Sequence, residues 1–571
     1  MPVFFNGRLW VSPATMSVVD DSAMANQNLS VGNVVALIGR AEGGEPKKAL
    51  RFGSPSEAVA TLRSGELLTA VLKAFDPSSQ VGGPATVVAV RVNPAVQSSL
   101  DLLSGASVPV IGLVSQDYGL YTTQISVQVE DGSVAGKKLT TRFGDNYFTE
   151  DNVQRRAFSV QYTGAEVSSS ITISGNSVSL AAPTGTTVAT IDLTVFDSIQ
   201  ELVDRINATS GFVASVLDGN GERQALNGLD YVSGQNIKSA PYVVKADLQA
   251  LVDWFNSTSE GFITATRKAN AGALPTNIPA TYLTGGIDGT VTNTDWSDAF
   301  QTLQAEDVQW VTPISSEPSI HAMADTHCTF MSNVARMERR CIVGTAAGTS
   351  DADAVDAAKA LNSDRASLVH LGFYDYDAAG KLTLYPPYIL AALLAGAFSG
   401  VNPGTPLTNK AIKVRGLERK LRNPTDTDVL INGGVLCVEE TNQGYKVVKS
   451  ISTWLINRNY NRVEVSTGVA TDFVARNVRN ALDVLRGEKA NPLILSRAVS
   501  ITESTLRELA RQEPQGPGVL AGDEASPPYK NIVASIEGDV LRVAFSCSPV
   551  IPVNYIPVTI YAVPYSGAAS S

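Results

Sequence analysis

The sequence contains few of the side chains on which most enzyme and metal chemistry depends. Its 571 residues include only three histidines and four cysteines. It has no C-x-x-C pair, no G-x-S-x-G nucleophile elbow and no G-x-x-x-x-G-K-[ST] phosphate loop. His321, His327 and Cys328 lie close in sequence, but positions six apart do not share a helix face well, so they form a poor metal site. We expect no catalytic residues, no metal and no cofactor.

Signals for disulfides and for membranes are also missing. The four cysteines are widely spaced, which favours a reducing compartment of synthesis over a disulfide framework. The amino-terminal residues lack the basic stretch and apolar run of a secretory signal. No run reaches the roughly 20 apolar residues of a membrane helix. The nearest, Tyr388 to Phe398, predicts a buried helix instead, so we expect no direct membrane insertion.

An excess of basic residues is missing as well. The chain has 44 Lys and Arg against 55 Asp and Glu, a net charge of −11. This argues against a nucleic-acid partner, which would favour a basic face, and for solubility at high concentration. The strongest basic run has no aromatic residues between its members, and we leave open whether it is a solvated face or a contact with another subunit or protein. It comprises Lys410, Lys413, Arg415, Arg419, Lys420 and Arg422.

The chain is too long for one hydrophobic core, and its first part predicts an α/β unit. Residues 34–38 and 85–92 are continuous apolar runs, typical of strands covered on both faces. A helix that begins at Ser54-Pro55 lies between them, which predicts parallel pairing. The α/β pattern resumes after Leu283 with strands at 308–312, 340–343 and 367–371, so we expect the two regions to share one sheet.

Residues 117–284 are rich in Ser, Thr, Gly and Val and alternate apolar with polar residues, as in Ile125-Ser-Val-Gln-Val129. This predicts a mainly β insertion into the shared sheet. After Pro406 we expect an α+β domain with a hairpin at 529–546 and an extended segment at 551–564. The other elements predicted there are strands at 428–431, 436–439, 446–449 and 462–466, and helices at 471–486 and 502–512.

Four short segments follow one another along the chain: Gly285-Gly-Ile-Asp-Gly289, Thr408-Asn-Lys410, Gly433-Gly-Val435 and Ile451-Ser-Thr-Trp454. Their order resembles that of contractile tail sheath proteins of myovirus-type bacteriophages and related contractile injection systems. The resemblance covers 283–571 well and 1–116 loosely, and it does not extend over 117–284. The start departs from the family, because Arg8-Leu-Trp-Val-Ser-Pro13 only partly matches a Ser-Pro-Gly-Val-Tyr-like strand.

The resemblance implies an α/β body with a mainly β protruding insertion, an α+β carboxy-terminal domain, and extended arms at both ends. The corresponding ranges are 1–24 for the amino-terminal arm, 25–116 with 285–400 for the body, 117–284 for the insertion, 401–550 for the carboxy-terminal domain and 551–571 for the carboxy-terminal arm. It further implies that arms add strands to the sheets of neighbouring subunits. The arm residues expected to do so are Val3, Phe4, Phe5, Leu9, Trp10, Val11, Val558, Ile560, Tyr561 and Val563.

The family's role would be that of a structural, non-enzymatic subunit which polymerises as stacked rings or a helix around an inner tail tube, and contracts to drive the tube through a cell envelope. Baseplate and tail terminator proteins would be further partners. The location would be the virion tail, after assembly in the host bacterial cytoplasm. Candidates for residues that face the tube or another subunit are Lys410, Lys413, Arg415, Arg419, Arg476 and Arg479.

Two other classes of function remain open at this point. An α/β hydrolase or nucleotide-binding enzyme with an accessory β domain fits the α/β pattern, and Gly39-Arg-Ala-Glu-Gly-Gly44 follows a buried strand as a phosphate loop would. A surface adhesin fits the Ser- and Thr-rich insertion. The weak nucleotide motif and the missing secretion signal count against them.

Overall fold

The computed structural model describes residues 3–5, 8–10, 34–258, 262–565 and 567. Its centre is a seven-stranded sheet with the order β26-β22-β21-β20-β3-β5-β4. All neighbours are parallel except β4, which is antiparallel to β5. The strands are β3 (Val34–Gly39), β4 (Ala49–Phe52), β5 (Thr86–Arg91), β20 (Trp310–Pro313), β21 (Arg340–Gly344), β22 (Ala366–Val369) and β26 (Val435–Leu436). The expected parallel pairing of the two apolar runs and the expected shared sheet are confirmed.

Helices cover both faces of this sheet, which explains the continuous apolar strands. Along β3, Val35 and Leu37 enter the core on one face, whereas Ala36 and Ile38 enter the core on the other. The first face is covered by α1 (Pro55–Leu62), α2 (Glu66–Phe75) and α8 (Pro387–Ser399). The second is covered by α5 (Asn293–Thr302), α6 (Pro318–Asn333), α7 (Asp351–Leu361) and α9 (Thr425–Asn432).

Helix α8 is buried along almost its whole length, as the apolar run at 388–398 predicts. It lies against α2 at very short range through Gly396. A Cβ at this position would stand 2.1 Å from the carbonyl oxygen of Ala74, so only glycine permits the approach. The close packing of these two helices fixes one face of the body.

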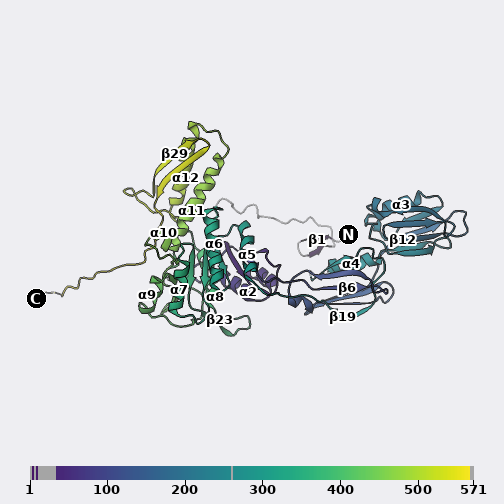
Figure 1. Ribbon diagram of the computed structural model, residues 1–571, viewed down its shortest axis with the longest axis horizontal. Helices are drawn as coiled ribbons and strands as arrows, with labels where there is room; N and C mark the ends of the chain where they lie inside the picture. Colours follow the sequence, from purple (N-terminus) through teal and green to yellow (C-terminus); the bar gives the residue numbers. More distant parts are fainter. Residues whose placement is uncertain (1–2, 6–7, 11–33, 259–261, 566, 568–571) are drawn as a thin grey trace.

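The insertion consists of two β modules, each with its own core, and Figure 1 shows them in line, projecting away from the body. The inner module contains the sheets β18-β7-β6 and β10-β9-β8-β19. Its elements are β6 (Ser99–Leu103), β7 (Pro109–Ser115), β8 (Ser126–Asp131), β9 (Lys137–Phe143), β10 (Asn146–Val153), α4 (Asp247–Thr258), β18 (Ile263–Arg267) and β19 (Ile278–Tyr282). Since β6 and β7 belong to this core, the inner module starts close to Ser99 rather than at residue 117.

The distal module is one continuous stretch of chain within the inner module. It contains the sheets β15-β11-β17 and β14-β13-β12-β16 and the helix α3 (Ile199–Asn207). The strands are β11 (Arg156–Tyr162), β12 (Ser170–Ser174), β13 (Ser177–Ala181), β14 (Thr187–Asp192), β15 (Phe212–Val216), β16 (Val232–Asn236) and β17 (Tyr242–Lys245). Its first and last residues, Arg156 and Lys245, are opposite each other in an antiparallel pair.

A buried guanidinium joins the inner module to the body. The side chain of Arg91, at the end of β5, is fully buried. It donates to the carbonyl oxygens of Gly44 and Tyr118 at 2.9 Å, and to Asp288 at 3.1 Å. Asp288 belongs to the Gly285–Gly289 segment, where the chain returns to the body, and it also accepts the backbone N–H of Leu120. Arg91 therefore ties the body to the loop after β7 of the inner module and to the segment through which the chain returns.

In the carboxy-terminal third, two predicted strands are wrong. Residues 428–431 lie in α9, and residues 462–466 lie in α10 (Tyr460–Val463) and the start of α11 (Val465–Leu482). In α9, Leu430 is buried while Val429 is 57% exposed, and two aspartates occupy the first turn, so a short apolar run is packed with helical geometry. The predicted helices start earlier than expected, at α11 and at α12 (Pro492–Ala510).

The other predicted elements of this region agree with the structure. Strands β27 (Val438–Thr441) and β28 (Gly444–Val447) form a hairpin. Strands β29 (Tyr529–Glu537) and β30 (Val540–Cys547) form the expected long hairpin around Gly538. Figure 1 shows α11, α12 and this second hairpin, in green and yellow, grouped on one side of the body.

Candidate inter-subunit surfaces

The carboxy-terminal arm leaves the body and does not return within the described residues. After β30, the backbone N–H of Val550 donates to the carbonyl oxygen of Val519 at 3.0 Å. No backbone hydrogen bond within the chain is found for the described residues 551–565. Figure 1 shows the later part of this segment as an extended trace that points away from every other element. The backbone donors and acceptors of the arm are therefore available to another chain.

The arm is strongly apolar although it is exposed. The side chains of Val558, Ile560, Tyr561 and Val563 are 75%, 85%, 86% and 84% exposed, respectively. In an extended chain, Ile556, Val558 and Ile560 lie on one face and Tyr561, Val563 and Tyr565 on the other. A strand that is apolar on both faces is typical of a strand covered on both sides. Such a run exposed to water marks an interaction site.

The hairpin β29–β30 offers open edges for such a strand. Among the described residues, no other strand pairs with either of its members. Its inner face packs on the helices through Ile532, Ala534, Ile536, Leu541, Val543, Phe545 and Cys547. The outer face is largely polar. Unpaired strand edges are the usual site where a strand from another chain is added.

A groove of about 700 Å³ runs between β30 and α11. Helix α12 packs chiefly against β29, which leaves β30 facing this groove. Its apolar lining includes Val478, Leu482, Leu485, Leu541, Val543 and Phe545, and charged residues such as Arg479, Asp483 and Arg486 lie along it. A strand added to the edge of β30 would place one of its faces over this apolar lining.

The amino-terminal arm is described only in part. Strands β1 (Val3–Phe5) and β2 (Arg8–Trp10) pair with each other, with Val3 opposite Trp10. The candidates Val3, Phe4, Phe5, Leu9 and Trp10 therefore lie in one small hairpin. Val11 lies outside the described residues. Whether this arm reaches a neighbouring subunit stays a prediction.

The basic candidates of the 410–422 run make contacts within the chain. Lys413 forms an ion pair with Asp76, and Arg419 with Asp351. The guanidinium of Arg415 lies 5.8 Å from the ring centroid of Tyr376. Lys410 is half-buried, and its backbone N–H donates to Leu407. Because Lys413, Arg415 and Arg419 remain exposed, these intramolecular contacts leave room for a contact with another chain.

Comparisons with known proteins show which proteins this chain is similar to. Residues 289–453 match the family model described as the phage tail sheath protein central domain. The chain is 28% identical to the tail sheath protein of Bacillus phage SP01, over 99% of this chain and 98% of the relative. It is 22% identical to that of Staphylococcus phage Twort, over 95% of both. Residues 289–453 belong to the phage tail sheath central domain family, and the whole chain is similar to tail sheath proteins. The resemblance stated from the sequence is confirmed.

Solved sheath proteins share the fold. The sheath tail protein from Listeria innocua matches with a TM-score of 0.55 at 13% identity, covering 92% of this chain and 94% of that one. The sheath tail protein from Desulfitobacterium hafniense matches with a TM-score of 0.51 at 12% identity, covering 95% and 100%. The mixed α/β and α+β multidomain architecture expected from the sequence is confirmed. The family is structural, and the alternative of a hydrolase or nucleotide enzyme finds no support.

In this sheath protein, two basic candidates point inward. Arg476 of α11 is buried, and its guanidinium donates to Asp307 at 2.8 Å and to the carbonyl oxygen of Glu338 at 3.0 Å. Arg479 donates to the carbonyl oxygen of Arg336 at 2.8 Å and forms an ion pair with Glu338. Both residues hold α11 against the body, which an amphipathic-helix pattern does not reveal.

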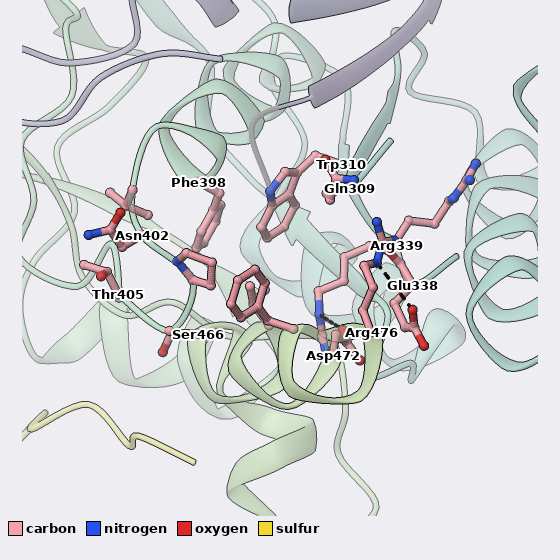
Figure 2. Close-up of a pocket in the computed structure, with 16 residues that line it drawn as sticks. Gln309, Trp310, Glu338, Arg339, Phe398, Asn402, Thr405, Ser466, Asp472 and Arg476 are labelled. Carbon is pink, nitrogen blue, oxygen red and sulfur yellow. Dashed lines mark hydrogen bonds and ion pairs between the residues drawn. The ribbon is translucent and has the colours of Figure 1, made fainter. Parts of the chain in front are cut away.

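Around Arg476, side chains of the body and of α11 line a small cavity at the interface between the body and the carboxy-terminal domain (Figure 2). Arg340 and Arg365 both form ion pairs with Asp472 of α11, at 3.1 and 2.6 Å. Trp310 stacks on Phe398 with ring centroids 4.7 Å apart. The cavity between these groups measures only about 50 Å³, room for a few waters but far below the roughly 300 Å³ of a small ligand pocket.

The two histidines considered as metal ligands in the sequence, His321 and His327, are buried and make hydrogen bonds inside the body. His321 bonds to the carbonyl oxygen of Ser315 at 2.9 Å, and His327 to Arg339 at 3.0 Å. Burial, with the neighbouring Arg339 charge, lowers the pKa of His327 to about 3, so its ring is neutral. Within the part of the chain that the structure describes, no three His, Cys, Asp or Glu residues are grouped to hold a metal ion. None of the described helices is long and apolar enough to cross a membrane.

Proposed function

We propose that this protein polymerises as the sheath subunit of a contractile tail, around an inner tube which contraction drives through a cell envelope. The sheath role follows from the family. The finer parts of the proposal are an inner tail tube protein, baseplate and tail terminator proteins as partners, and assembly in the host bacterial cytoplasm before incorporation into the virion tail.

The observation that carries the proposal is the exposed apolar arm. A monomeric protein that kept Ile560, Tyr561 and Val563 in water would forgo about 1.5–3 kcal/mol of burial for each large side chain. The chain also presents an acceptor, the open edge of β30 beside an apolar groove. The arm and the β30 edge that would receive it lie at different places on the same molecule. Such a pair of surfaces forms a head-to-tail interface between copies, which generates rings or helices rather than closed dimers.

Main-chain pairing would add to this burial. Eight residues of β30 can pair with a strand of similar length, and each hydrogen bond contributes about 0.5–1.5 kcal/mol net. The cost of ordering the arm, about 1–2 kcal/mol per residue, offsets much of the gain. The link is therefore strong only when pairing and apolar burial occur together, as they do at the β30 edge over the groove.

Contraction requires a further property of the lattice. The extended arrangement must have a higher free energy than the contracted one and must be held by a kinetic barrier. Arms that remain inserted in neighbours would keep the subunits connected while their bodies rotate. A small difference per subunit then adds over many copies.

Truncation after Tyr555 tests the proposal. Because residues 556–565 make no backbone hydrogen bond to the body, the shortened chain should keep the melting temperature of the full chain. It should fail to form tubes, as judged by electron microscopy and sedimentation. Val558→Asp should weaken assembly in the same way, whereas Thr559→Ser, one residue away, should not. Tubes formed by the truncated chain at the usual concentration would refute the arm's role.

A further inference from the structure

The arm root, residues 551–555, lies against the body before the arm becomes free. Just before it, the carbonyl oxygen of Val550 accepts the hydroxyl hydrogen bond of Thr467 at 3.1 Å. Within the arm root, Ile551, Val553 and Tyr555 are exposed, whereas Pro552 and Asn554 are half-buried. This alternation is that of an extended segment with one side on the body.

Asn554 is the last described residue of the arm with a side-chain hydrogen bond to the body. Its Nδ2 donates to Oε1 of Glu464 at 2.9 Å. The Glu464 side chain is only 1% exposed and forms an ion pair with Lys449 at 3.2 Å. The Lys449 ammonium also lies 5.8 Å from the ring centroid of Tyr555. Two residues of the body thus converge on the end of the arm root.

This contact is only partly satisfied. The second carboxylate oxygen of Glu464 and Oδ1 of Asn554 are buried, and neither has a hydrogen-bond donor among the described residues. Burial raises the pKa of Glu464, although Lys449 and Asn554 both act to lower it. Buried acceptors without donors destabilise the arrangement that contains them. The closed contact is therefore held less firmly than one in which every buried acceptor has a donor.

We infer that Asn554, Glu464 and Lys449 form a releasable latch that fixes where the carboxy-terminal arm leaves the body. With the latch closed, the free arm begins at Ile556. With it open, the nearest fixed residue is Val550, and five more residues add up to about 17 Å of reach at roughly 3.3–3.6 Å per residue. This inference rests on the proposed function, in which arms stay inserted while bodies move, and the released length is the slack that such movement needs.

The latch can be tested on the free subunit, without assembly. Chymotrypsin cleaves after Tyr555 at the latch and after Tyr561 in the free arm, so the second site is an internal reference. Asn554→Ala should raise the ratio of the cleavage rate after Tyr555 to the rate after Tyr561 at least fivefold. Asn554→Asp, which places a like charge beside Glu464, should raise this ratio at least as much. Val553→Ala, with its side chain 79% exposed, should leave the ratio unchanged. An unchanged ratio in Asn554→Ala overturns the latch.

The role as slack needs a second measurement on polymers of the full chain. Asn554→Ala should still form tubes, and these should contract at a lower urea concentration than wild-type or Val553→Ala tubes. If the protease assay shows that Asn554→Ala opens the arm root, but its tubes contract at the same urea concentration as wild-type tubes, the released length is not used in contraction. Tube formation by the chain truncated after Tyr555 would instead overturn the proposed function and leave the protease result standing.

Discussion

At the residue scale, the most consequential contacts join segments that are far apart in sequence. Arg91 stands at the end of an apolar strand, where the sequence gives no sign of a partner. Its carboxylate partner Asp288 lies 197 positions away. The glycine-rich Gly285–Gly289 segment was visible as a motif, but its task, to bring Asp288 to Arg91, follows only from the fold. Buried polar networks of this kind depend on tertiary geometry and leave no local pattern.

Arg91→Leu should destabilise the body by about 2–4 kcal/mol, because it leaves the buried carbonyl oxygen of Gly44 and the partly buried carbonyl oxygen of Tyr118 without their donor. Arg51→Leu is the matched control. That arginine pairs with Glu306 but its side chain is 64% exposed, so its loss should cost no more than about 1 kcal/mol. Urea denaturation followed by tryptophan fluorescence compares the two, and similar midpoints would contradict the assigned role of Arg91.

Asp230 gives the joint between the two inserted modules a pH dependence. Its carboxylate accepts the N–H groups of Asp247 and Leu248 at the start of α4, at 2.8 and 3.0 Å. Burial nevertheless raises its pKa from 3.8 to about 6. The folded chain then binds this proton more tightly than the unfolded chain does, so the free energy of unfolding falls as pH rises from about 4 to 6 and levels off above.

The expected size of this effect is up to about 3 kcal/mol, since one pKa unit corresponds to about 1.4 kcal/mol. Asp230→Asn removes the titrating group. The unfolding free energy of the wild type minus that of this variant should therefore fall as the pH rises across the window. A difference that stays flat between pH 4 and 7 would show that Asp230 titrates normally.

At the element scale, the sequence was most informative where a segment is covered on both faces. The apolar runs at β3, β5 and α8 could be assigned because full burial leaves a continuous pattern. The runs at 428–431 and 462–466 could not, because four or five apolar and polar residues fit a helix as well as a strand. There the choice was made by packing on α7 and by the ion pairs of α11, which are tertiary contacts.

The boundary of the insertion was missed for a related reason. Strands β6 and β7 follow β5 directly and look like a continuation of the body, yet they complete the core of the inner module with β18. Excising residues 117–284 would remove β18 and expose Leu102, Ile111 and Leu113 to water. The structure indicates that a deletion should remove the distal module alone.

Removing residues 157–244 and joining Arg156 to Lys245 through Asn-Gly should give a folded chain that still assembles. The two joined residues are already opposite each other in an antiparallel pair, and Asn-Gly suits a two-residue hairpin turn. The loss of Asp230 at the start of α4 should cost about 1 kcal/mol. Calorimetry and electron microscopy provide the readout. Aggregation of this chain, with folding of the 117–284 deletion, would contradict a start of the inner module close to Ser99.

At the scale of the whole molecule, the sequence indicated the family and the presence of arms, since the ordered segments of the family and the β-prone runs at the chain ends are visible without a structure. It did not show where an arm could be received. The β30 edge, the groove along α11 and the latch at Asn554 all arise from segments brought together by folding. The basic candidates Arg476 and Arg479 were selected by charge and spacing, and the structure places them in contacts within the chain.

The most direct measurement is a cryo-electron microscopy map of the assembled sheath in which residues 556–565 can be traced. We predict density for this segment as a strand on a different subunit, along β30 and over the groove that contains Leu482 and Val543. Density for the same residues folded back on their own subunit, or an assembled lattice in which they cross to no neighbour, would contradict the exchange of arms between subunits.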